Sequence, residues 1–296
     1  MKMSRLGMAW DRWWFADTDP HPIAAFRVLV GVYLLLYLGV MIPHVPSVFS
    51  SDGVYVPYAF GDYAPSPLVA SVVFAVTYAL AGALMIGYRT RVVAPLLLAG
   101  VLYHYFLALA VKHSAYDRLL IVFLVVLCFA EADRVWSLHA RNLRGPAKPV
   151  PVWAERVVRF QMVALYFGAG LWKLIHPAWR SGAFLEMEMQ GLWATPIGFW
   201  LAGQELGPLF WVIASWGIIG FELFVGGFLL QPQTRGVAVL LLAVFHVANV
   251  VILFVPEFLL CLAGLVLFVP AGTLRGWVAQ IRPRRDVVVG SPRQHA

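Results

Sequence analysis

Long apolar runs alternate with short polar segments along almost the whole chain. The runs match or approach the roughly 20 residues that a helix needs to cross about 30 Å of hydrocarbon. Helices are expected rather than strands, because a lone strand cannot pair its backbone groups in lipid. The predicted spans are residues 22–43, 67–88, 92–111, 117–136, 155–175, 208–230, 236–255 and 257–274. The pattern therefore predicts an all-α, polytopic transmembrane helix bundle with about eight spans.

Two of these spans depend on short apolar stretches. In the fourth span the uninterrupted apolar stretch covers only residues 119–130, and the eighth is separated from the seventh by Pro256 and Glu257. The basic residues support keeping the fourth span. Without it, Arg89 and Arg91 would lie on the opposite side of the membrane from the C-terminal arginines.

The composition favours lipid over water as the solvent of this chain. Hydrophobic residues make up 61% of the sequence, charged residues make up 12%, and the mean hydropathy is +0.78. Soluble domains carry roughly a quarter charged residues. A chain of 296 residues cannot hide such an apolar surplus in a core, because most of its surface would face water. A soluble globular protein is therefore excluded.

The placement of lysine and arginine gives the bundle a direction. Most of the 22 basic residues fall in the N-terminal segment, in every second connection and in the C-terminal tail. The outer segments hold Lys112, Arg118, Lys173 and Arg180. By the positive-inside rule both termini therefore lie inside. The net charge of +7 is spread over several connections rather than gathered in one patch, so no nucleic acid partner is predicted.

The chain is predicted to have three parts. Residues 1–21 form an interfacial N-terminal segment, residues 22–274 the transmembrane domain, and residues 275–296 a basic, disordered cytoplasmic tail. Within the transmembrane domain, the tryptophan-bearing outer segment 176–207 is predicted to be interfacial or re-entrant. The proline-rich stretch 145–151 divides the spans into two equal sets.

Polar side chains inside spans are functional candidates, because their burial in lipid is costly. Four of them fall at middle depth: His104, Glu222, His246 and Asn249. Two interpretations stay open, one buried network that forms a site, or interhelical hydrogen bonds that only fix the packing. Arg27 lies early in the first span and is expected to extend toward the inner surface, or to pair with Glu131 or Asp133.

Two basic residues near the outer ends of their spans are candidates for proton transfer. Lys173 lies at the end of the fifth span, close to Gly168 and Gly170, and His113 follows the third. Desolvation on an apolar helix favours the neutral amine of lysine, which is a proton acceptor. The alternative is a lysine that only reaches toward the interface. No HExxH motif or His pair with ligand spacing occurs, so no metal site is predicted.

The end of the fifth predicted span carries the residues on which a family resemblance rests. It reads Tyr166-Phe167-Gly168-Ala169-Gly170-Leu171-Trp172-Lys173-Leu174 and is followed by Trp179 and Gly182. This stretch resembles the YF-x-AG-x-x-KL…W-x-x-G pattern of the vitamin K-dependent γ-carboxylase family. Further elements occur in matching order: Phe26-Arg27 with Gly31, His113-Ser114 with Tyr116, Glu222 with Gly226 and Gly227, and Phe245-His246 with Asn249. Over about residues 10–272 the chain is similar to bacterial HTTM-domain proteins, which share the membrane part of these carboxylases.

The resemblance implies an enzyme that couples epoxidation of a reduced naphthoquinone (vitamin K or menaquinone hydroquinone) to removal of a carbon-bound proton. Dioxygen and carbon dioxide are the implied co-substrates of this epoxidation and carboxylation. Lys173 matches the base that deprotonates the hydroquinone, and His113 matches a histidine that assists it. The implied quinone-binding residues are Tyr166, His104, Glu222, His246 and Asn249. The reaction would take place at the outer face of a bacterial inner membrane.

The sequence also departs from the carboxylases. They carry a large lumenal domain after the membrane part, whereas this sequence ends soon after its last predicted span, and Lys112 precedes His113 where they have asparagine. Peptide γ-carboxylation therefore stays open, and the alternatives are a small molecule, a lipid, or quinone and dioxygen alone. The expected partners are membrane lipid, quinone, an unknown acceptor substrate and a separate periplasmic or membrane protein. The alternative function is a non-catalytic transporter or a partner subunit of a membrane complex.

Overall fold

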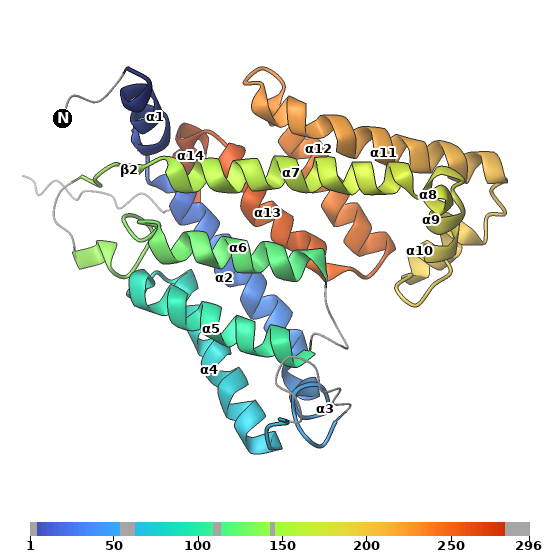
Figure 1. Cartoon of the computed structure of the whole chain (residues 1–296), viewed down its shortest axis with the longest axis horizontal. Coiled ribbons are helices and arrows are strands. Elements are labelled where there is room, and N and C mark those ends of the chain that lie inside the picture. The colour runs from blue at the N-terminus through green and yellow to red at the C-terminus, as the bar shows by residue number, and fades with distance from the viewer. Residues whose placement is uncertain (1–4, 54–62, 109–113, 143–145, 282–296) are drawn as a thin grey trace, which may run out of the picture.

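The computed structural model describes residues 5–53, 63–108, 114–142 and 146–281, and these residues are mostly helical (Figure 1). The long helices are α2 (His21–Met41), α4 (Pro67–Met85), α5 (Thr90–Ala108), α6 (Ala115–Phe129), α7 (Trp153–Ile175), α11 (Pro208–Leu230) and α12 (Arg235–Ile252). The shorter helices are α1 (Arg5–Phe15), η1 (Ile42–His44), α3 (Val45–Phe49), η2 (Ala140–Asn142), α8 (Pro177–Arg180), α9 (Ala183–Glu188), α10 (Pro196–Ala202), η3 (Pro256–Leu259), α13 (Leu260–Leu265), η4 (Val266–Phe268) and α14 (Ala271–Ile281). Two short strands, β1 (Asp17–Thr18) and β2 (Val150–Pro151), pair in antiparallel register.

Local sequence signals set several helix ends. Ser66 precedes α4, and its side chain accepts a hydrogen bond from the Val69 backbone N–H. Ser114 and Asp117 form a reciprocal capping box at the start of α6. Both arrangements pair backbone N–H groups that have no partner within the first helical turn. Beyond the end of α4, Gly87 adopts a φ of 69°, the left-handed conformation that commonly ends a helix.

The helices pack as a bundle around one main core (Figure 1). The closest pairs are α7 with α11, α2 with α4, and α5 with its neighbours α4 and α6. Small residues allow the first two pairs to approach closely. A Cβ on Gly170 would lie 2.9 Å from the backbone nitrogen of Leu223, and a Cβ on Gly31 would lie 2.6 Å from Cβ of Met85. Glycines at such contacts let membrane helices pack backbone against backbone.

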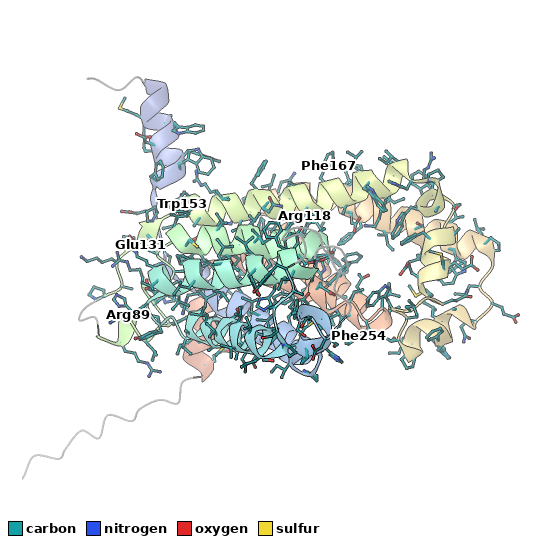
Figure 2. All side chains as sticks on the ribbon, turned by 60° about the horizontal axis from the view of Figure 1, so that its bottom comes forward. Arg89, Arg118, Glu131, Trp153, Phe167 and Phe254 are labelled. Carbon is teal, nitrogen blue, oxygen red and sulfur yellow. The ribbon has the colours of Figure 1, made fainter. Side chains whose placement is uncertain are left out.

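The outer surface of the bundle is strongly apolar. Only 17% of the most apolar window of α12 and 28% of that of α4 are buried inside the protein. Their remaining side chains need an apolar solvent, because exposed apolar surface of this extent is not stable in water. Figure 2 shows the same outward placement for Phe167 on α7, whose side chain is exposed. The chain is therefore an integral membrane protein.

The predicted number of about eight spans is not confirmed. By length and composition, five helices among the described residues are able to cross a membrane, or six if a bent pair counts as one. The fourth predicted span corresponds to α6, which has only 15 residues. The fifth corresponds to α7, which has 23 residues but carries four charged side chains. The eighth is broken: the helical segments 256–268 and 271–280 meet at 108° around Pro270.

Arg27 does not reach the inner surface, and its hydrogen bonds go to the backbone rather than to a carboxylate. Its side chain is fully buried. It donates to the carbonyl oxygens of Leu84 and Met85 at the end of α4, at 2.9 and 3.1 Å, and to that of Trp136 at 2.6 Å. The prediction of an extended arginine was therefore wrong. The reason is that the last carbonyls of α4 have no partner within their own helix, and a guanidinium has enough donors to bind several of them.

Gly87 is expected to be essential where Arg27 binds the end of α4. Replacing it with alanine should lower the free energy of unfolding by about 1–3 kcal/mol or more, because φ is positive and the added Cβ would lie 2.2 Å from Nη1 of Arg27. Gly217→Ala in α11 is the matched control, since its Cβ would meet nothing within 4 Å. Unfolding titrations of both purified variants in mixed detergent micelles measure the difference in stability. Equal stability of the two would contradict the expectation.

Three short helices, α8, α9 and α10, lie across one end of α11 and α12 (Figure 1). Ser215 in α11 donates a hydrogen bond to the carbonyl of Trp179, at 2.5 Å. The hydroxyl of Thr195 donates to the carbonyls of Val251 and Ile252, near the end of α12, at 2.7 and 3.0 Å. Gly182 makes the turn between α8 and α9 possible, with a φ of 77° and no room for a Cβ beside Trp211. The segment predicted to be interfacial or re-entrant thus forms a cap, which we call the α8–α10 cap.

Candidate functional site

A buried ion pair joins α7 to α11. The Nζ atom of Lys173 donates to Oε2 of Glu222 at 2.6 Å, and the two side chains are 14% and 6% exposed. Buried charges are costly unless they are paired, so each group lowers the free-energy cost of burying the other. Sequence analysis singled out both residues but did not predict that they pair.

The close packing of α7 on α11 brings these two side chains within reach. Gly170 lies one turn before Lys173, on the face of α7 that meets Glu222 and Leu223. Gly226 lies one turn after Glu222 and meets Val163 of α7. Residues three and four apart share a helix face, so the glycines and the charged residues belong to one contact strip. The small residues of the motif therefore have a direct role in placing Lys173.

The α8–α10 cap covers the lysine on one side. The helix α7 ends at Ile175, and the chain turns at His176 and Pro177 into α8. This turn places the Trp179 ring with its centroid 5.0 Å from Nζ of Lys173, a distance typical of a cation–π contact. Trp179 itself is buried. The contact of Trp179 with Lys173 was not predicted from the sequence. The signal for Trp179 was its place in the family pattern.

A second polar pair lies on the same helix as Lys173. The Tyr166 hydroxyl and Nε2 of His246 in α12 are 2.8 Å apart and form a buried hydrogen bond. Tyr166 and Lys173 are two helical turns apart, and seven residues return to the same side of an α-helix. Glu222 faces the same helix from α11, since its carboxylate binds Lys173. The two pairs therefore line one polar region between α7, α11 and α12.

Aromatic rings enclose this region. Phe258 lies against the His246 ring with a centroid distance of 5.6 Å and against the Tyr116 ring at 4.6 Å. Phe245 packs beside His246 at 5.5 Å. Aromatic walls with a few polar groups are typical of sites for flat organic molecules. The start of α6, which carries Tyr116, thus contributes to the same region.

Two buried nitrogen atoms in this region have no hydrogen-bond partner among the described residues. They are Nε1 of Trp179 and Nδ1 of His246. Buried polar atoms are almost always paired, so such atoms point to a ligand or to a water molecule. A naphthoquinone carries two oxygens on a flat ring, and these would pair with N–H groups. In chemical type, the Trp179 indole and the His246 imidazole beside aromatic rings are suitable partners for the oxygens of a quinone headgroup.

The structure does not join the four predicted mid-membrane residues into one network. Nδ1 of His104 lies 2.7 Å from the carbonyl of Gly100 in its own helix. The His104 ring packs against Phe49 and Phe74, away from the Lys173 region. Asn249 donates to the carbonyl of Phe245, one turn earlier in α12. Among the described residues, no hydrogen bond connects His104 or Asn249 to Glu222 or His246. Each of these two side chains therefore bonds to a backbone carbonyl of its own helix, while Nε2 of His104 is buried without a partner among the described residues.

His113 lies outside the described residues, and its predicted support of Lys173 stays a prediction. Ser114, the next residue, caps α6 with its side chain. Also within the described residues, no group of three or more His, Cys, Asp or Glu side chains converges as metal ligands would.

A comparison with known families gives a match over most of the chain. The model of the HTTM domain family matches residues 15–272. This range contains the Lys173–Glu222 ion pair, the Tyr166–His246 pair and the α8–α10 cap. No solved structure matches the chain.

Proposed function

Because the chain belongs to the HTTM domain family, we propose that it is a membrane enzyme that oxidises a reduced naphthoquinone to its epoxide. The family is associated with the membrane region of vitamin K-dependent carboxylases. The observation that carries the proposal is the buried Lys173–Glu222 pair, which lies beside Trp179 and close to buried nitrogens that lack partners. Dioxygen and carbon dioxide are the proposed co-substrates, and the outer face of a bacterial inner membrane is the proposed location.

A lysine that acts as a base must first lose a proton. Glu222 provides the acceptor, since its Oε2 lies 2.6 Å from Nζ of Lys173. Transfer of one proton along this hydrogen bond converts ammonium and carboxylate into amine and carboxylic acid. When a bound headgroup excludes the remaining water, this neutral form is favoured, because solvation no longer stabilises the separate charges. Glu222 is thus proposed to control when Lys173 is a base.

The neutral amine of Lys173 then accepts the hydroxyl proton of the hydroquinone. The quinone, when bound, supplies the redox chemistry: with dioxygen it yields the epoxide and one water molecule. Tyr166 and His246 are proposed to orient its headgroup, and the aromatic walls to exclude water from the reacting atoms. Proton removal from an acceptor and its carboxylation would use the strong base that this oxidation generates.

The test measures quinone epoxide formed by the purified protein from reduced menaquinone and dioxygen. Lys173→Arg keeps a cation opposite Glu222, but a guanidinium does not give up its proton. Epoxide formation should therefore fall by roughly 100-fold or more, the usual contribution of a general base. Lys148→Ala, at an exposed lysine, is the matched control and should keep wild-type activity.

Two results would overturn the proposal. Equal epoxide from wild type and Lys173→Arg would show that Lys173 is not the base. No epoxide from any variant, wild type included, would show that the protein is not an epoxidase. A naphthoquinone that stays with the wild-type protein during purification, and is lost in Tyr166→Ala, would support the proposed binding region independently of turnover.

A further inference from the structure

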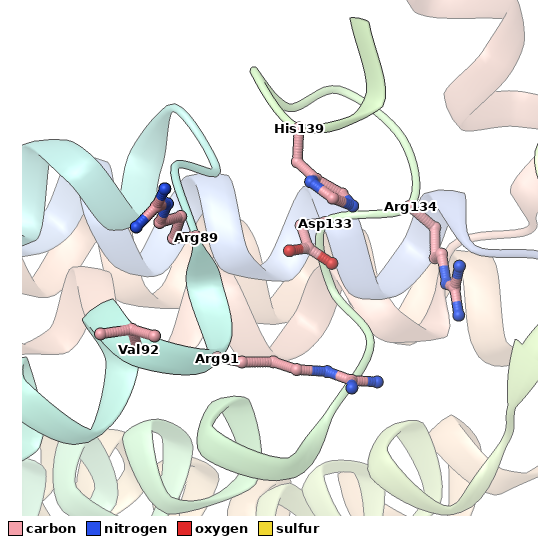
Figure 3. A pocket seen from close by; sticks show the side chains of 6 residues that line it. All are labelled: Arg89, Arg91, Val92, Asp133, Arg134 and His139. Atoms are coloured by element: carbon pink, nitrogen blue, oxygen red, sulfur yellow. The ribbon is translucent and has the colours of Figure 1, made fainter. Parts of the chain in front are cut away.

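A cavity lies at the opposite end of the bundle from the α8–α10 cap. Its volume is about 400 Å³, and it is lined by Arg89, Arg91 and Val92 at the start of α5 and by Asp133, Arg134 and His139 after α6. This volume falls within the roughly 300–1,000 Å³ that is typical of ligand sites. Figure 3 shows the basic side chains placed around the Asp133 carboxylate. Nothing in the proposed quinone chemistry uses these residues.

The charges around this cavity do not cancel. Glu131 binds two of the arginines: Nη2 of Arg91 at 2.9 Å and Nε of Arg134 at 2.6 Å. Asp133 lies among the basic side chains that line the cavity (Figure 3). Each of the two carboxylates therefore already faces at least one arginine.

Arg89 adds a positive charge that has no such partner. Within the described part of the chain, its guanidinium has no hydrogen bond to another side chain, and its contact is with the ring of the adjacent Tyr88. Arg89 also holds a φ of 41°, which is uncommon for a residue other than glycine. A guanidinium has five donors, so Arg91 and Arg134 also keep N–H groups beyond those that bind Glu131. The cavity thus presents a surplus of positive charge and of hydrogen-bond donors.

We propose that this cavity binds the phosphate of an anionic phospholipid headgroup. Planar guanidinium groups match phosphate oxygens in charge and geometry, and Arg91 and Arg134 are already oriented by Glu131. The acyl chains of such a lipid would lie on the apolar surface of α5 beside the cavity. Val92 lines the cavity and is 56% exposed, and Leu96 one turn later on α5 is 54% exposed. An exposed apolar helix face that leads into a basic cavity suits a lipid better than a soluble phosphate compound.

The predicted orientation agrees with this occupant. Positive charge at these connections predicts that they lie inside, and anionic lipids of the cytoplasmic leaflet bind basic pockets between transmembrane helices on that side. The inference does not depend on the proposed quinone chemistry, since the two sites lie at different ends of the bundle.

The experiment counts lipids bound to the purified full-length protein by native mass spectrometry from mild detergent. Phosphatidylglycerol, phosphatidylcholine and glycerol 3-phosphate are titrated separately. Wild type should retain one phosphatidylglycerol, with much weaker binding of phosphatidylcholine and of glycerol 3-phosphate. Arg89→Gln should bind phosphatidylglycerol about tenfold more weakly, because a charge-assisted hydrogen bond is lost.

Arg89 is suited to this test because its exposed side chain can be replaced without breaking a hydrogen bond among the described residues. An unchanged unfolding midpoint of Arg89→Gln confirms that the fold is kept. Arg141→Gln is the matched control: it removes one exposed positive charge near the cavity but not from its lining. It should bind phosphatidylglycerol as wild type does.

Each contrary result has a defined meaning. Equal weakening by Arg89→Gln and Arg141→Gln would show that only general charge attracts the lipid, and would overturn the site. Equal phosphatidylglycerol binding in wild type and Arg89→Gln would also overturn it. Glycerol 3-phosphate that binds as tightly as phosphatidylglycerol would overturn the lipid as occupant and point to a soluble phosphate.

Discussion

Glu222→Leu is expected to lower the free energy of unfolding by about 3–5 kcal/mol, the usual result of removing one partner of a buried ion pair. The variant leaves the Lys173 ammonium without its carboxylate in a region where its side chain is only 14% exposed. The volume changes little, so the loss reports the unpaired charge rather than a cavity. Unfolding of the purified protein in mixed detergent micelles, followed by helical circular dichroism, measures the difference.

The double variant Lys173→Met with Glu222→Leu separates the charge from the packing. Replacing both partners by apolar side chains removes the unpaired charge, and buried ion pairs exchanged in this way are often neutral or stabilising. The double variant should therefore recover most of the stability that Glu222→Leu loses. A double variant as unstable as the single one would contradict the ion-pair explanation. Both variants should lack epoxide formation. The double variant would therefore regain stability without regaining activity.

Arg27→Met is expected to have an effect of similar size at the other end of the bundle. It removes the hydrogen bonds to the carbonyls of Leu84, Met85 and Trp136, and leaves these acceptors buried. Hydrogen bonds to charged groups contribute about 1.5–3 kcal/mol each and are not fully additive, so a total loss of roughly 3–5 kcal/mol is expected. The same unfolding titration measures it.

Arg91→Met serves as the matched control for Arg27→Met. Arg91, near the start of α5, is likewise an arginine, but its side chain is 67% exposed and pairs with Glu131 at the surface. Exposed ion pairs contribute about 0–1 kcal/mol, so little change is expected. Arg27→Lys should recover only part of the loss, because an ammonium cannot reproduce the fork of a guanidinium. If Arg27→Met were no more harmful than Arg91→Met, the proposed role of Arg27 in closing α4 would be wrong.

Much of the helical architecture follows from local sequence signals. The apolar runs predicted α2, α4, α5, α11 and α12, since a run of sufficient length in lipid has only the helix available. Serine caps and Gly87 agree with the observed helix ends. The number of spans was less predictable. Hydropathy alone does not reveal that α6 ends after 15 residues, or that the chain turns by 108° at Pro270.

For the candidate site, residue types were visible in the sequence and partners were not. Lys173, Glu222 and His246 stand out as polar groups in apolar runs, because their burial in lipid is costly, whereas Tyr166 was indicated only by the family resemblance. Which of them pair depends on helix rotation and on the distance between helix axes. The contact of Gly170 with Leu223 sets this distance for α7 and α11, over a separation of about fifty residues in the sequence.

The same distinction explains the residues whose predicted roles changed. Arg27 was expected to extend toward the inner surface or to pair with a carboxylate, and one of two open interpretations joined His104 and Asn249 to a network. In the structure each of the three bonds to backbone carbonyls. Hydropathy and charge patterns show that a polar side chain is buried, because those patterns depend on composition along the chain. They do not show which acceptor is nearest, because long-range packing brings segments such as α2, the end of α4 and Trp136 to one point. The sequence thus establishes a membrane protein with costly buried polar groups, and only tertiary packing decides which of these groups meet.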